Sequence, residues 1–357
     1  MTAQDTLAAP AAGRIGSASP VRMWLFTVAA LVCIMVSIGG ATRLTGSGLS
    51  ITEWQPIIGT IPPLTDAAWH EAFDKYRQIP QYRQVNKGMS LSDFKFIFWW
   101  EWSHRFLARL VGVVFFVPFV FLLATGRIPR ALAPKLAAIF LLGGLQGFIG
   151  WYMVYSGLAG RVDVSQYRLA LHLSLAFVIL GATLWIAMGL RQPGERRATE
   201  GLPGYRFAIA ILGLLFLQII AGAFVAGMKA GAGYNTWPLM DGQMIPEGLF
   251  ALHPRWANLF ENALTVQFNH RLLAYILFAA VAWQTWRCVQ RAEHGAAQAS
   301  AMALLLAVLA QIGLGIWTLL AHVPIELGLA HQAGAVAVFW IAVWHVHALS
   351  PQRSVAR

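Results

Sequence analysis

Four histidines in apolar surroundings are the residues whose type and spacing best suit chemistry in this chain. An imidazole in hydrocarbon needs a polar partner, and it is also the commonest axial ligand of heme iron. Two stand in the first half of the chain and two at matching points in the second, namely His104, His172, His270 and His331. Two pairs predict two sites for metal or porphyrin. The alternative for any one of them is a buried polar residue bonded to a backbone carbonyl.

A carboxyl group separates the two pairs. Glu101 stands three residues before His104, whereas Gln267 holds the matching place before His270. A carboxyl can bind or relay protons and a carboxamide cannot, so we expect the first half to be reactive and the second to be structural or electron-conducting. The alternative for Glu101 is a glutamate favoured by the dipole at a helix N-terminus.

Three arginines are candidates for pairing with the carboxylate propionates of a porphyrin. Arg105 and Arg271 directly follow two of the histidines, and Arg43 lies at the end of the first apolar run. A guanidinium matches a carboxylate with two parallel hydrogen bonds. The alternative is that these side chains reach toward lipid phosphate or water.

The composition predicts that these residues lie in membrane-spanning helices. Of 357 residues, 58% are hydrophobic and only 11% are charged, which is too apolar for a soluble domain. A span needs about 20 apolar residues, and continuous apolar runs indicate helices rather than barrel strands. We expect eight spans, at about 22–43, 97–124, 134–156, 166–190, 204–228, 264–287, 298–321 and 326–348.

The positive charge follows the connections between spans. The net charge is +11, and no nucleic-acid module surrounds the basic residues. Those in the short connections fall on one face of an eight-span topology, which the positive-inside tendency makes cytoplasmic together with both termini. They are Arg127, Arg130 and Lys135, then Arg191, Arg196, Arg197 and Arg206, then Arg287 and Arg291. No removable signal peptide is apparent.

The chain repeats itself once. Gly39-Gly40-Ala41 matches Ala221-Gly222-Ala223, Trp54 matches Trp237, and the histidine pairs follow in the same order. The fold class is therefore an all-α polytopic membrane protein of two four-helix repeats, related by a pseudo-two-fold axis along the membrane normal. The expected parts are a tail at 1–21, a unit at 22–190, an inner linker at 191–203, a second unit at 204–348 and a tail at 349–357.

Two further features of the first unit carry expectations. An outer loop at about 44–96 is long enough for a lid or a docking surface, and its amphipathic stretch from Trp69 to Phe73 is expected to lie flat on the membrane. A group of glycines between 143 and 150 is expected to let neighbouring helices approach closely.

Together these segments closely resemble the heme A synthase family, over residues 22 to 348. The residues that carry the resemblance are Gly39 to Thr45, Ser47 to Ser50, Trp54-Gln55-Pro56, Asn86 to Met89, Glu101, His104-Arg105, His172, Phe268 to Arg271 and His331-Gln332. One branch of the family has a cysteine pair in an outer loop. This chain lacks that pair and resembles the other branch, found in proteobacteria and mitochondria.

The resemblance implies an enzyme of the cell inner membrane that oxidises the C8 methyl group of heme O to a formyl group, giving heme A for cytochrome oxidase. His104 and His172 would flank heme O, with Glu101 as the catalytic residue, and His270 and His331 would ligate a permanent heme b. The implied partners are the farnesyltransferase that makes heme O, oxidase assembly factors and membrane lipid, with an electron donor or acceptor that the sequence does not identify. The sequence does not decide whether the protein forms a homo-oligomer.

Two alternatives compete with this interpretation, of which the first fits the histidines nearly as well and the second ranks last. A diheme b-type electron carrier serving quinones would need the same four histidines. Such a carrier has no need of a carboxyl at only one of its two sites. The presence of Glu101 beside one pair and of Gln267 beside the other therefore separates it from the synthase. A proton-coupled carrier built from repeats would need charged residues near mid-membrane in the odd-numbered spans, where the sequence has almost none.

Overall fold

The structure is a computed structural model that describes residues 18–55, 57–158, 160–190, 202–291 and 295–351. Most of the two predicted tails and of the inner linker lie outside the described residues, and Arg191, Arg196 and Arg197 lie there with them.

Eight long apolar helices within the described residues match the eight predicted spans, which confirms the all-helical polytopic fold. They are α1 (Ala18–Leu44), α4 (Leu91–Ala124), α5 (Ala133–Leu158), α6 (Gln166–Gly189), α7 (Tyr205–Gly227), α9 (Ala263–Gln290), α10 (Ala296–Leu320) and α11 (Ile325–Leu349). Short elements occupy the outer connections, namely η1 (Ile58–Thr60), α2 (Asp66–Tyr76), α3 (Pro80–Gln84), η2 (Ala230–Ala232), η3 (Arg255–Ala257) and α8 (Asn258–Glu261).

Helix α4 begins about two turns earlier than the apolar run predicts. Ser90 and Asp93 form a capping box, in which the Ser90 hydroxyl accepts from the Asp93 N–H at 3.2 Å and the Asp93 carboxylate accepts from the Ser90 N–H at 3.3 Å. This cap satisfies two of the open donors at the helix start. The polar first turns of α4 therefore project beyond the apolar part and support the outer loop.

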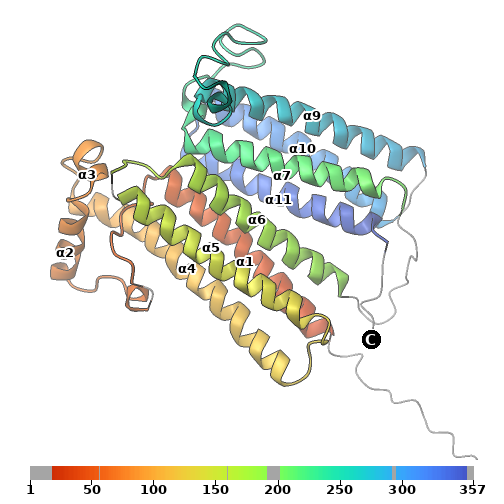
Figure 1. Cartoon of the computed structure of the whole chain (residues 1–357), viewed down its shortest axis with the longest axis horizontal. Coiled ribbons are helices and arrows are strands. Elements are labelled where there is room, and N and C mark those ends of the chain that lie inside the picture. The colour runs from red at the N-terminus through yellow and green to blue at the C-terminus, as the bar shows by residue number, and fades with distance from the viewer. Residues whose placement is uncertain (1–17, 56, 159, 191–201, 292–294, 352–357) are drawn as a thin grey trace, which may run out of the picture.

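The helices group into two four-helix bundles (Figure 1). In the first, α1 and α5 each contact both α4 and α6, so that α4 and α6 are diagonal to each other. In the second, α7 and α10 each contact both α9 and α11, which makes α9 and α11 diagonal. Helices α1 and α6 meet α7 and α11 where the bundles join. This grouping follows the two predicted units, while the symmetry axis between them stays a prediction.

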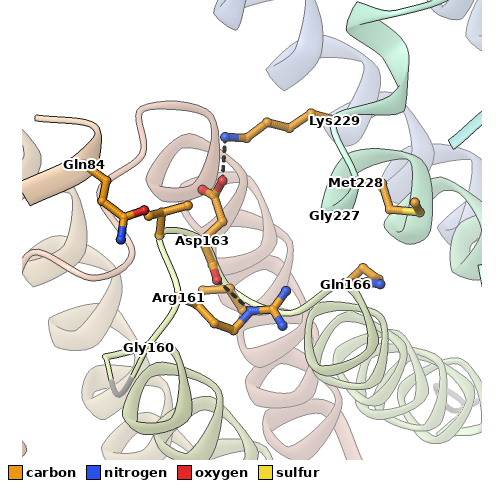
Figure 2. A pocket seen from close by; sticks show the side chains of 10 residues that line it. Gln84, Gly160, Arg161, Asp163, Gln166, Gly227, Met228 and Lys229 are labelled. Atoms are coloured by element: carbon orange, nitrogen blue, oxygen red, sulfur yellow. Dashed lines mark hydrogen bonds and ion pairs between the residues drawn. The ribbon is translucent and has the colours of Figure 1, made fainter. Parts of the chain in front are cut away.

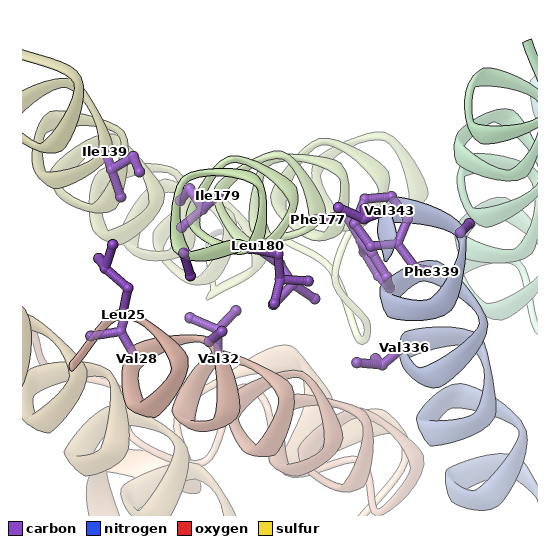
Figure 3. Packing of buried hydrophobic residues seen from close by; sticks show 14 of the residues in the cluster. Leu25, Val28, Val32, Ile139, Phe177, Ile179, Leu180, Val336, Phe339 and Val343 are labelled. Carbon is purple, nitrogen blue, oxygen red and sulfur yellow. The ribbon is translucent and has the colours of Figure 1, made fainter. Parts of the chain in front are cut away.

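The largest apolar cluster runs through the place where the two bundles join. Figure 3 shows Val32 of α1, Phe177 and Leu180 of α6 and Phe339 of α11 pointing toward one another. The rings of Phe177 and Phe339 meet edge to face with centroids 5.0 Å apart. Aromatic pairs favour this arrangement, because the positive edge of one ring faces the negative face of the other.

Polar bonds also cross between the bundles. The side chain of Gln332 in α11 donates to the carbonyl of Val36 in α1 at 2.7 Å. It lies against Gly40, where a side chain would collide with it. Arg43, at the end of α1, donates to the carbonyl of Ala226 in α7. Helix α1 is therefore fixed to the second bundle at two levels.

The amphipathic helix α2 packs on the outer turns of α4. Its buried residues Trp69, Phe73 and Tyr76 pack against Phe94 and Phe98. The ring centroids of Phe73 and Phe94 are 4.9 Å apart. The apolar face that the sequence predicts to lie on the membrane is therefore covered by α4.

Tyr76 also joins α2 to the segment that follows it. Its hydroxyl donates to Gln81 at 2.9 Å and accepts from Asn86 at 2.7 Å. Burial raises the pKa of the Tyr76 hydroxyl, so the phenol stays neutral and keeps donating.

The start of α1 and the end of α11 lie at the same end of the molecule, opposite α2 and α3 (Figure 1). An even number of crossings requires this arrangement. The connection from α4 to α5, which carries Arg127 and Arg130, lies at that end as well.

We expect Phe73→Ala to loosen the outer layer while the bundles stay folded. Removing a buried phenylalanine costs about 3 to 5 kcal/mol, because the transfer free energy is lost and a cavity remains. Faster protease cleavage between residues 45 and 90 would report the change. Val85→Ala is the control, since Val85 is 62% exposed. Equal cleavage rates in the two variants would contradict the packing of α2 on α4.

Candidate heme sites

The four predicted histidines lie on the diagonal helices of the two bundles. His104 is on α4 and His172 on α6, while His270 is on α9 and His331 on α11. All four rings are half-buried. The rings of His104 and His172 lie within electrostatic range of each other, and so do those of His270 and His331. The structure thus brings each predicted pair together across the interior of one bundle.

Each ring rests against a glycine of a neighbouring helix. A Cβ added at the glycine would stand 3.0 Å from His104 at Gly39, 2.9 Å from His172 at Gly150, 3.1 Å from His270 at Gly222 and 2.7 Å from His331 at Gly315. These distances are at or near the limit below which real side chains do not approach. Only glycine leaves room for the ring so close to the next helix.

A glutamine accompanies three of the four rings. Gln146, Gln218 and Gln311 each stand four residues before the ring-facing glycine on the same helix. Their amide nitrogens donate to the backbone carbonyls of His172, His270 and His331 at 3.0, 3.1 and 2.7 Å, and lie 3.4, 3.5 and 3.2 Å from a ring nitrogen. On α1 the residue four positions before the ring-facing Gly39 is Met35, which has no amide. His104 therefore lacks the amide that holds the other three histidines.

The histidines fit a porphyrin iron better than a metal held by protein ligands alone. Among the residues that the structure describes, no group of three or more His, Cys, Asp or Glu side chains could hold an ion. In contrast, two imidazoles suffice for heme iron, since the porphyrin supplies the other four ligands. The Nδ1 atoms of His172 and His270 are buried with no hydrogen-bond partner in the described structure. A buried polar atom without a partner is costly and marks a place where a ligand belongs.

Glu101 lies one turn from His104 and is 2% exposed. One carboxylate oxygen accepts from the Ser50 hydroxyl and the Ile51 N–H, each at 2.8 Å. The other accepts from the guanidinium of Arg105 at 3.1 and 2.5 Å. The carboxylate is thus an ion-pair partner of Arg105 and the point at which the outer loop is fixed to α4.

Arg105 continues this connection. Its guanidinium donates to the carbonyls of Ile51 at 2.8 Å and Glu53 at 3.0 Å in addition to Glu101. The same α4 face therefore holds the loop at Ser50, Ile51 and Glu53, close to the first histidine pair.

The second bundle has the same arrangement with one charge fewer. The amide of Gln267 donates to the carbonyls of Ala230 at 3.0 Å and Tyr234 at 3.2 Å. Arg271 donates through Nη2 to Tyr234 at 3.0 Å and to Gln267 at 3.1 Å. Its Nε and Nη1 atoms are buried and have no partner among the described residues. Arg271 therefore retains donors for an anionic group, whereas Arg105 is already neutralised by Glu101.

A separate pocket of about 480 Å³ lies between the bundles, at the end of the molecule opposite the termini (Figure 2). Asp163 accepts from Lys229 at 2.6 Å across it, and the Asp163 carbonyl accepts from Arg161 at 3.3 Å. Its other lining residues are Gln84, Gly160, Val162, Val164, Gln166, Gly227 and Met228. None of the lining residues is one of the four histidines, so this pocket is distinct from the candidate heme sites.

Eight membrane-crossing helices with a histidine pair inside each four-helix bundle define a polytopic membrane protein. A family model described as cytochrome oxidase assembly protein (COX15-CtaA) matches residues 22–343. The chain belongs to this family. The match confirms the resemblance drawn from the motifs.

Named relatives agree with this membership. A heme A synthase of Parvibaculum lavamentivorans is 58% identical over 330 residues, which cover 92% of this chain and 94% of that protein. A heme A synthase of Nitrosomonas eutropha is 50% identical over 334 residues, covering 93% of this chain and 94% of that protein. A heme A synthase of Mesorhizobium japonicum is 52% identical over 328 residues, covering 91% and 89%.

Sequence reasoning found the histidines but missed the residues that hold them. The glycines that face the rings and the three glutamines carried no expectation of a site role. The recurring pattern of glutamine followed four residues later by glycine, at Gln146, Gln218 and Gln311, is the signal that could have revealed them. Of the glycines expected to allow close helix approach, Gly143, Gly144 and Gly147 face open space in the structure, and Gly150 faces His172.

We expect Gly315→Ala to reduce heme binding in the second bundle. Alanine favours a helix over glycine by about 1 kcal/mol, so a loss must come from the contact of its methyl group with His331. The readout is the amount of low-spin heme per purified chain. Gly313→Ala is a matched control on α10, because a Cβ there meets nothing within 4 Å. Equal heme content in both variants would contradict the role of the glycine.

Proposed function

We propose that this chain is a heme A synthase, which oxidises the C8 methyl group of heme O to a formyl group and so supplies heme A for cytochrome oxidase. The single observation that carries the proposal is a facing histidine pair in each bundle, with a carboxyl beside only one of them. Family membership and relatives named heme A synthase, at 50 to 58% identity, support it. The oxidation of a substrate at one pair and electron exchange at the other need such unequal sites.

We assign heme O to the first bundle, between His104 and His172. His104 is the ring without a glutamine on the neighbouring helix, so it is the less constrained of the four. A ligand that must be admitted and released is better served by a ring with this freedom. Heme A, the product, leaves from the same pair.

We assign a permanent heme b to His270 and His331 in the second bundle. Each of these rings has both its glycine and its glutamine, which fixes its orientation. The unpaired Nε and Nη1 of Arg271 suit a propionate carboxylate. Bound there, heme b supplies one-electron transfer. Arg105 and Arg43 stay candidates for propionate contacts in the first bundle, although both already donate within the protein.

Glu101 is our candidate for moving protons away from the reacting methyl group. It stands one turn from His104, and its ion pair with Arg105 keeps the carboxylate in place. Oxidation of a methyl group to a formyl group removes electrons as well as protons, so it needs the electron acceptor named among the partners below, while a fixed carboxylate beside the site can take up the protons. Gln267 cannot do this in the second bundle.

We place the protein in the cell inner membrane with both termini cytoplasmic. The described basic residues of the inner connections support this orientation through the positive-inside tendency. The proposed partners are the farnesyltransferase that makes heme O, oxidase assembly factors, an electron donor or acceptor, and membrane lipid.

Extraction of pigment from the purified protein tests the division between the bundles. We expect heme b in constant proportion to the chain, together with heme O or heme A in amounts that vary with expression conditions. Chromatography of the extract measures both. Two molecules of heme b per chain with neither heme O nor heme A would instead indicate a diheme electron carrier.

We expect Glu101→Gln to retain heme b and heme O but to lower the yield of heme A at least tenfold, a loss of about 1.4 kcal/mol or more in transition-state stabilisation. Glutamine has the shape of glutamate, and Gln267 shows that it fits this place beside an arginine. Chromatography of hemes from cells gives the ratio of heme A to heme O. Glu71→Gln, which removes an exposed carboxylate that pairs with Lys75 in α2, is the control and should leave that ratio unchanged. A normal ratio in Glu101→Gln would remove the proposed role.

A further inference from the structure

The start of the outer loop runs down one face of α4 into the apolar part of that helix. Glu101, Arg105 and Arg109 are spaced four residues apart and so share this face. Glu101 holds Ser50 and Ile51, and Arg105 holds Ile51 and Glu53. Arg109 donates to the carbonyl of Gln55 at 3.0 Å. The chain therefore descends two helical turns as it runs from residue 50 to residue 55.

The neighbours of Arg109 on α4 show how deep in the membrane the loop lies at residue 55. Trp99, Trp100 and Trp102 form an aromatic group of the kind found at membrane interfaces. Arg109 lies seven residues further along α4, which is about 10 Å at the rise of a helix. Phe106, Leu110 and Val113 surround this level and are 38%, 39% and 56% exposed. Exposed side chains of this kind on a membrane-crossing helix face lipid.

The segment from Ile57 to Leu64, which we call the 57–64 turn, has the composition of lipid-facing protein. Ile57, Ile58, Ile61 and Leu64 are 83%, 73%, 65% and 77% exposed. No charged residue occurs between Glu53 and Asp66. Four such side chains together in water would be a large apolar patch of the kind that soluble surfaces avoid.

Part of the backbone of this turn is hydrogen-bonded within the protein. The N–H groups of Gly59, Thr60 and Ile61 donate to the carbonyls of Gln55, Ile57 and Ile58 at 3.1, 3.1 and 3.0 Å. The carbonyl of Gln55 accepts from both Gly59 and Arg109. Non-helical backbone at membrane depth needs partners for its polar groups, and these bonds supply several of them, while Pro62 and Pro63 have no N–H group to leave open.

We propose that the 57–64 turn is a re-entrant segment, whose apolar side chains are inserted among the acyl chains of the outer leaflet beside α4. The polar face of α4 holds its backbone, and lipid covers its isoleucines and Leu64. The partner of this surface is therefore the bilayer itself.

Insertion has a consequence for how molecules reach the first bundle. Trp54, just before the turn, lies near Trp151 of α5 with ring centroids 6.3 Å apart. The loop thus spans α4 and α5 on the lipid side of the bundle. A hydrophobic molecule dissolved in the outer leaflet would meet this segment where it approaches the first bundle between α4 and α5. Its relevance to heme O, which carries a prenyl chain, rests on the proposed function, whereas the insertion itself does not.

A fluorescent label on a single cysteine tests the insertion. The variant Ile58→Cys is made in the full chain with Cys33→Ala and Cys288→Ala, labelled with an environment-sensitive dye and placed in phosphatidylcholine vesicles. Val85→Cys is the matched control, because Val85 is an exposed apolar residue of the same loop at 62% exposure, but lies between Arg83 and Lys87.

At Ile58 we expect blue-shifted emission, strong quenching by a nitroxide on the lipid acyl chain and weak quenching by iodide. The label at Val85 should show the reverse. Leu64→Cys provides a second position in the turn if Ile58→Cys does not accumulate. Iodide quenching in the turn as strong as at Val85 would overturn the proposal.

Discussion

A polar ring inside a bilayer has to be held by its own protein, and both bundles are built around this requirement. Water is not there to complete the hydrogen bonds of an imidazole, so position and direction must come from neighbouring helices. A glycine on the neighbouring helix leaves room for the ring, and a glutamine on that same neighbouring helix donates to the backbone carbonyl of the histidine. Gly315 and Gln311 of α10 do this for His331 of α11. Each of these contacts joins two helices. The packing of each bundle and the geometry of its candidate iron site are thus set by the same contacts.

The charges beside the histidines differ between the two bundles. In the first bundle Glu101 and Arg105 neutralise each other, and the guanidinium already has partners on three sides. In the second, neutral Gln267 leaves Arg271 as a partly buried cation without an ion pair in the described structure. A buried charge without a partner is unfavourable and is relieved when an anion binds. This difference supports the proposed assignment of a permanent heme b to the second bundle and of heme O to the first.

The spans and the histidines could be predicted because their signals lie along the chain. Continuous apolar runs indicate helices wherever they occur, and matched histidines stand out in a sequence with few polar residues. The start of α4 was missed because its capping box at Ser90 precedes residues too polar for a span. The role of a glycine depends on which residue of the neighbouring helix faces it, and the order of residues along the sequence does not show this. Gly147 faces open space and Gly150 faces His172, although both belong to one group of glycines in α5.

The two long loops at the end opposite the termini are each held by the helix that carries the first histidine of their bundle. The contacts come from positions four residues apart, at Glu101, Arg105 and Arg109 on α4 and at Gln267, Arg271 and Tyr275 on α9. In each bundle the histidine stands between the first and second of these positions. A displacement of the loop therefore acts on the same helical turn as the ring. In the first bundle this turn also carries the ion pair, so loop position, carboxylate position and the setting of His104 are mechanically coupled. The second bundle repeats the coupling without the carboxylate, which is the arrangement expected where only a fixed ligand has to be kept.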